Sequence, residues 1–90
     1  MATITLWVGS KSFITGGEYK QVTVEGEELA TVRFSDEVLV RVVKAEDGKV
    51  IVNYIEREGY DVRSDVFEYA DLNEAAVYER FVLRRAGIIK

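Results

Sequence analysis

The chain contains no cysteine, no histidine and no proline. Without cysteine, no disulfide can support a fold of only 90 residues. Without cysteine and histidine together, the usual ligands of structural zinc and of iron–sulfur clusters are missing. The same two absences exclude Ser-His-Asp and Cys-His catalytic arrangements. We therefore expect a non-enzymatic protein without a cofactor or a metal ion.

The remaining polar residues form no catalytic motif. Acidic pairs occur at Glu27/Glu28, Asp36/Glu37, Glu46/Asp47 and Glu56/Glu58. Each pair lies at an expected turn or strand end, where carboxylates are ordinarily solvated rather than converging across a cleft. The segment Gly9-Ser10-Lys11-Ser12 follows a strand pattern but lacks the spacing of a phosphate-binding loop. We predict no catalytic, cofactor-binding or metal-binding residue.

Long apolar runs are also missing. No stretch approaches the roughly 18 apolar residues of a membrane span, and the first residues do not resemble a signal peptide. Twelve basic and sixteen acidic residues give a net charge of −4, which argues against a strongly basic duplex-DNA binder. We expect a cytoplasmic protein with no membrane partner. Glutamine and asparagine are scarce, and methionine occurs only at position 1, a composition that resembles thermophilic proteins.

The patterns predict a single domain over residues 1–90, strand-rich from 2 to 69. Apolar and polar residues alternate over 2–8, 19–24 and 30–34, which indicates three strands, and a short final strand is expected over 65–69. We expect a loop over 10–17, with Phe13 and Ile14 packed back onto the core. A turn is predicted at 26–28 and a charged connector over 56–63.

The clearest local signal is a hairpin over residues 37–56, around Asp47-Gly48. A two-residue turn would place Val43 opposite Val52. A three-residue loop with Gly48 in a left-handed conformation would instead pair Val42 with Val52. The second register is preferred because it gathers the apolar residues on one face, and the buried face determines register. That face consists of Val38, Val40, Val42, Val50, Val52 and Tyr54.

One amphipathic helix is expected over residues 72–86. Asp71 is a suitable N-cap, with Glu74 three residues later as in a capping box. Gly87 is placed to end the helix in a left-handed conformation, with Ile88 touching Leu83.

The second face of the hairpin is also apolar, which indicates that both faces are buried against another part of the chain or against a partner. The helix carries more apolar residues than a minimal stripe requires. Surplus apolar surface on a small domain is typical of an interface. We therefore predict a protein-interaction module that associates with itself, as a homodimer, or with another protein. The expected interface residues are Leu39, Val43, Ile51, Ile55, Val77, Tyr78 and Phe81, with Arg80, Arg84 and Arg85 at its rim.

A nucleic-acid-binding protein is the alternative. Trp7, Tyr19, Arg33 and Arg41 are expected on the outward faces of the strands, where aromatic and arginine side chains stack single-stranded bases in small barrels.

These elements predict an α+β fold: a curved, mainly antiparallel sheet of five or six strands, or a partly open small barrel, with one C-terminal helix. The order of strand, long loop, strands, hairpin and terminal helix is similar to that of SH3-like barrels. This similarity concerns element order alone and implies no function.

Overall fold

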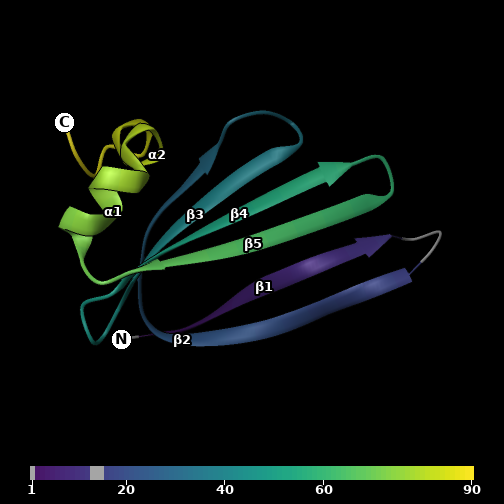
Figure 1. The fold of residues 1–90 in the computed structure, drawn as a ribbon, viewed down its shortest axis with the longest axis horizontal. Coiled ribbons are helices and arrows are strands. Elements are labelled where there is room, and N and C mark those ends of the chain that lie inside the picture. Colours follow the sequence, from purple (N-terminus) through teal and green to yellow (C-terminus); the bar gives the residue numbers. More distant parts are fainter. Residues whose placement is uncertain (1, 13–15) are drawn as a thin grey trace.

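The computed structural model describes residues 2–12 and 16–90. Five antiparallel strands form a closed barrel in the order β1-β2-β3-β4-β5, and two short helices follow (Figure 1). The expected small antiparallel barrel is therefore confirmed. The elements are β1 (Ala2–Ser12), β2 (Gly16–Arg33), β3 (Val38–Ala45), β4 (Val50–Glu58), β5 (Asp61–Tyr69), α1 (Leu72–Tyr78) and α2 (Arg80–Arg85).

The β3–β4 hairpin has the predicted register. Val42 pairs with Val52, Val40 with Tyr54 and Lys44 with Val50. Gly48 has φ +92°, a backbone conformation that glycine adopts without a Cβ penalty. The preference for a shared apolar face therefore identified the correct pairing.

The expected turn at residues 26–28 is wrong, because β2 passes through this region as one bent strand of 18 residues. At the bend, Gly26 pairs with Ala2 of β1 on one side and with Ala45 of β3 on the other. A Cβ at Gly26 would lie 2.2 Å from the Lys44 carbonyl oxygen, so only glycine fits. A register shift between Glu28 and Ala30 increases the local bend. This bend allows β2 to pair with both neighbours.

Two predicted connections are shorter than expected, because the strands extend further. β1 continues to Ser12, and β2 begins at Gly16, so Gly9-Ser10-Lys11-Ser12 is strand rather than loop. Phe13 and Ile14 lie outside the described residues. The expected connector over 56–63 is divided between the end of β4, a tight turn and the start of β5.

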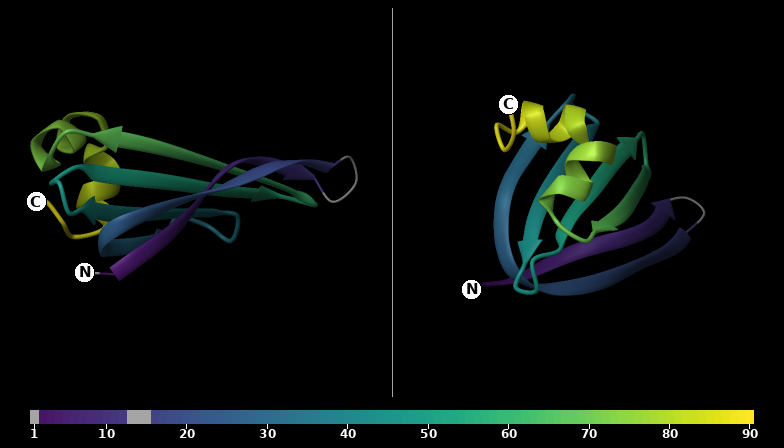
Figure 2. Two further views of the ribbon diagram at one scale, coloured as in Figure 1. Left: turned by 90° about the horizontal axis from the view of Figure 1, so that it is seen from below. Right: turned by 60° about the vertical axis from the view of Figure 1, so that its left-hand side comes forward.

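The barrel closes between β1 and β5 over a short distance only. Residues 9–12 of β1 pair with residues 61–64 of β5. Towards its N-terminus, β1 separates from β5, as the left panel of Figure 2 shows.

Two apolar clusters occupy opposite faces of the β3–β4 hairpin. Inside the barrel, Ile4, Leu6, Val43 and Ile51 form the smaller cluster. Outside it, the helices cover the other face at the end of the molecule away from the end of β1 and the start of β2 (Figures 1 and 2). This larger cluster contains Val40, Val42, Val50, Val52, Ala75, Val82 and Leu83.

The single expected helix is in fact two, because the backbone leaves helical geometry at Glu79, with φ −121° and ψ 33°. The predicted ends are confirmed. The Asp71 carboxylate accepts a hydrogen bond from the Glu74 amide, and Gly87 has φ +78° while the Ile88 amide donates to the Leu83 carbonyl. Within the described residues, neither helix has the length and apolar character needed to cross a membrane.

Candidate protein-interaction surface

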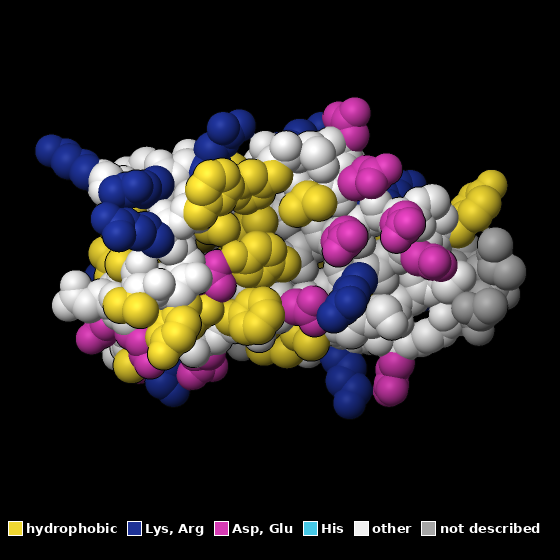
Figure 3. Space-filling model, turned by 45° about the horizontal axis from the view of Figure 1, so that its top comes forward, with side chains coloured by type: hydrophobic (Ala, Val, Ile, Leu, Met, Phe, Trp, Pro, Cys, Tyr) yellow, Lys and Arg dark blue, Asp and Glu magenta, His cyan; other side chains and the backbone are white. Residues whose placement is uncertain are grey.

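Six aromatic side chains gather where the helices meet the sheet. They form three ring pairs, each with centroids 5.7 Å apart: Phe34 with Phe81, Tyr54 with Phe67, and Tyr69 with Tyr78. We call these six residues the aromatic patch. Figure 3 shows hydrophobic side chains gathered over this part of the molecule, with basic side chains beside them.

Several members of the aromatic patch are far more exposed than packing of a helix on a sheet requires. Phe81 is 73% exposed and Tyr78 69%, and the neighbouring Val77 is 74% exposed. By contrast, Val82 and Leu83, which follow Phe81 in α2, are buried. The helical segment thus has one face in the core and a second apolar face in solvent.

A groove of about 320 Å³ lies between the helices and the sheet within this patch. Its aromatic walls come from Phe34, Tyr54, Tyr78 and Phe81. The only charged side chain that lines it, among the residues described, is Glu79.

Glu79 is half-buried, and its carboxylate accepts hydrogen bonds from two tyrosines of the patch. Its Oε1 accepts a hydrogen bond of 2.7 Å from the Tyr69 hydroxyl, and its Oε2 accepts one from the Tyr54 hydroxyl. Burial, together with these bonds to the carboxylate, raises the pKa of Tyr69 to about 12 and raises the pKa of Tyr54 further. Both phenols are donors at neutral pH, as ordinary tyrosines are, and the raised pKa values keep them protonated further into the alkaline range.

Arginines of α2 border the patch. The Arg85 guanidinium carbon lies 5.9 Å from the centre of the Phe34 ring, within the range of a cation–π contact. Arg84 donates to the Lys90 carbonyl oxygen at 3.2 Å. Basic groups therefore lie close to an apolar surface that contains one carboxylate.

The structure separates the seven predicted interface residues into two groups. Tyr78 and Phe81 are exposed and line the groove, and Val77 is exposed in a separate hollow lined also by Ala76 and Arg80. Val43 and Ile51 are buried inside the barrel, and Leu39 and Ile55 are half-buried near its end. The second face of the hairpin is therefore covered by the chain's own β1 and β2, and only the helical part of the prediction lies at the surface.

The barrel interior also contains polar side chains that sequence reasoning did not single out. Asn53 and Ser64 are fully buried. The Asn53 amide donates to Ser64 Oγ at 2.9 Å and to the Asp65 carbonyl at 3.1 Å, and Ser64 donates to the Trp7 carbonyl. These bonds connect β1 to β4 and β5 near the point where the strands separate. A lone Asn within an apolar strand is the only sequence signal for them.

The four residues of the predicted nucleic-acid face do not lie together on one surface. Trp7 and Tyr19 stack with ring centroids 5.5 Å apart. Arg41 instead donates to Glu28 at 2.9 Å and to the Thr5 carbonyl at 3.0 Å. The Arg41 hydrogen bond is the main reason that the pKa of Glu28 is lowered. Arg33 lies at the opposite end of β2 from Tyr19.

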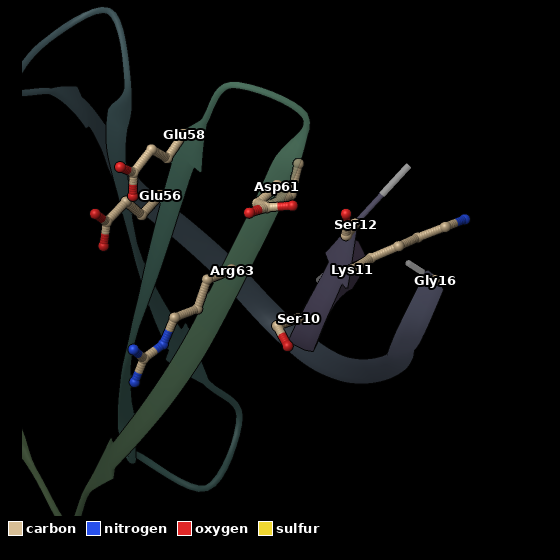
Figure 4. Close-up of a pocket in the computed structure, with 9 residues that line it drawn as sticks. Ser10, Lys11, Ser12, Gly16, Glu56, Glu58, Asp61 and Arg63 are labelled. Carbon is tan, nitrogen blue, oxygen red and sulfur yellow. The ribbon is translucent and has the colours of Figure 1, made fainter. Parts of the chain in front are cut away.

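A polar pocket of about 380 Å³ lies between the end of β1, the end of β4 and the start of β5 (Figure 4). Glu56 and Glu58 come from β4 and Asp61 from β5, while Lys11 extends away from these carboxylates. No group of three or more acidic residues in the described part of the chain is arranged to hold a metal ion. The pocket therefore offers no converging set of reactive groups.

Comparisons with protein-family models, curated proteins and solved structures give no match to this chain.

Proposed function

We propose that this chain is a non-enzymatic protein-interaction module that associates with itself through the aromatic patch and Val77. The observation that supports the proposal is the exposure of Tyr78 and Phe81 within a continuous group of aromatic side chains. Exposed apolar patches on small monomeric domains are rare outside binding sites, and aromatic residues and arginine are enriched at interfaces.

A second copy is the partner that the surface fits best. Glu79 precedes α2, and Arg84 and Arg85 lie in its last turn, so a twofold axis between these two ends would place the carboxylate of each copy opposite the arginines of the other. A small barrel without disulfides also gains stability from an added interface.

Light scattering coupled to size-exclusion chromatography tests the proposal. We expect the wild-type chain to approach twice the monomer mass as its concentration rises. The double variant Tyr78→Ser, Phe81→Ser should remain a monomer. The matched control is Tyr60→Ser, because Tyr60 is 67% exposed at the β4–β5 turn, away from the patch. A monomeric wild-type chain at high concentration would contradict self-association.

The nucleic-acid alternative has less support, because only the Trp7–Tyr19 pair remains of its four residues. Titration with single-stranded oligonucleotides at low salt tests it, since base stacking would quench Trp7 fluorescence. Unchanged fluorescence would remove this alternative.

A further inference from the structure

The groove in the aromatic patch has the chemistry of a cation site. Four of its lining residues are aromatic, and Glu79 places a carboxylate among them. The faces of aromatic rings carry partial negative charge and attract cations, most strongly where water is excluded. Ring faces and a carboxylate together therefore favour a positively charged occupant.

Glu79 lacks a cationic partner of its own within residues 2–12 and 16–90. The ion pairs found there involve other acidic residues, namely Glu28, Asp47, Asp65 and Glu68. Its two hydrogen-bond donors are the neutral hydroxyls of Tyr54 and Tyr69. A carboxylate accepts about four hydrogen bonds, so about two positions remain for a further donor.

We propose that the groove binds the guanidinium group of an arginine side chain from the partner protein. An arginine is favoured over a lysine because its planar group stacks on rings and donates several hydrogen bonds to a carboxylate at once. The chain already contains one such contact, Arg85 on Phe34. This inference rests on the proposed function, since it assigns a chemical ligand to the same surface.

In the self-associated form, the second copy supplies the arginine. Arg84 and Arg85 lie in the last turn of α2, where Arg85 contacts Phe34 of the patch, and Arg80 begins the helix. An antiparallel pairing of two α2 helices would bring this basic end of one copy towards Glu79 of the other. The arrangement explains why one short helix carries three arginines next to an apolar surface.

The test is an NMR titration of the full chain with N-acetyl-arginine methylamide. The neutral citrulline analogue is the matched ligand, because it keeps the shape and loses the charge. We expect the arginine probe to shift signals of Tyr78, Glu79 and Phe81 in a saturable manner, and the citrulline probe to bind at least about tenfold more weakly, as loss of a charge-assisted bond implies.

The variant Glu79→Gln should lose about tenfold in affinity for the arginine probe, while its amide oxygen accepts from one tyrosine and its amide nitrogen donates to the hydroxyl oxygen of the other. Glu46→Gln, an exposed residue at the β3–β4 turn, removes the same charge elsewhere and should leave the affinity unchanged. Equal affinity for both probes, unchanged binding in Glu79→Gln, or no shift at the groove would overturn the inference.

The two experiments can reject self-association and the arginine site independently of each other. If light scattering finds a dimer and the arginine probe does not bind, the cation site is wrong and self-association stands. If the chain stays monomeric but the probe binds with the expected dependence on Glu79, self-association is wrong and the groove remains an arginine site for another partner.

Discussion

At the scale of single residues, two polar side chains connect β1 to other strands of the barrel where β1 and β5 are not paired. Arg41 donates to the Thr5 carbonyl, and Ser64 donates to the Trp7 carbonyl, along the part of β1 that has no pairing with β5. Side chains from the interior therefore satisfy carbonyl groups that a neighbouring strand would otherwise bind. This arrangement accounts for polar residues in the core of a chain of only 90 residues.

Asn53→Ala tests this role. We expect the free energy of unfolding to fall by about 2 kcal/mol, because buried polar groups lose their donor. Urea unfolding followed by circular dichroism gives the value. Asn73→Ala, on an exposed position of α1, should change stability by less than about 0.5 kcal/mol. Similar effects at both positions would show that the buried amide contributes little.

Tyr69 predicts how stability depends on alkaline pH. Its pKa is raised to about 12 in the folded chain, mainly by burial and then by Glu79, and an unfolded tyrosine ionises near 10. The stabilisation is complete below pH 10. Above it, the unfolded chain loses a proton that the folded chain keeps, so stability falls as pH rises towards 12. Tyr54 acts in the same direction.

Urea unfolding between pH 9 and about 11.5 measures this loss, and absorbance at 295 nm follows tyrosine ionisation. Glu79→Gln should lose stability less steeply with pH, because one cause of the raised pKa values is removed while burial remains. Identical pH dependence in the wild type and the variant would contradict the assigned role of Glu79.

At the scale of elements, local signals predicted what local interactions determine. Asp47-Gly48 and the shared valine face gave the hairpin register, and Asp71 and Gly87 gave the helix ends. Long-range contacts determined the rest. The bend at Gly26 depends on close approach of the Lys44 carbonyl from another strand, which no local pattern reveals.

Long-range contacts also decide which of the predicted interface residues lie at the surface. The apolar second face of the hairpin predicts that this face is buried, but it does not identify what buries it. In the structure, residues of β1 and β2 pack against it. The helical residues Val77, Tyr78 and Phe81 were recognised because they exceeded a minimal stripe. Glu79 interrupts that stripe in the sequence, but its position between two tyrosines depends on the fold.

The two faces of the broken helix should respond differently to truncation. Leu83 is fully buried against the sheet, so Leu83→Ala should cost about 2–5 kcal/mol of unfolding free energy. Val77→Ala should change monomer stability by less than about 0.5 kcal/mol, since Val77 is exposed. Chemical denaturation at a concentration that keeps the chain monomeric gives both values. Equal costs would mean that the solvent-facing side contributes to the core.

At the scale of the whole molecule, the fold is elongated, with extents of 40 × 25 × 19 Å. The helices lie at one end, and the end of β1 and the start of β2 lie at the other (Figure 1). The aromatic patch extends from the helices over the adjoining face of the sheet (Figure 3). Antiparallel association of two copies through the patch would bring their helices together and leave the start of β2 in one copy far from that in the other.

Distances between spin labels test this claim most directly. Because the chain has no cysteine, a single introduced cysteine gives one label per copy. Asn73→Cys places it on α1, the helix that carries Tyr78, and Lys20→Cys places it on the first part of β2; both positions are exposed. Double electron–electron resonance should give a short distance between the two copies at position 73 and a much longer one at position 20. A shorter distance at position 20, or no dipolar signal at position 73 at high protein concentration, would contradict association through the patch.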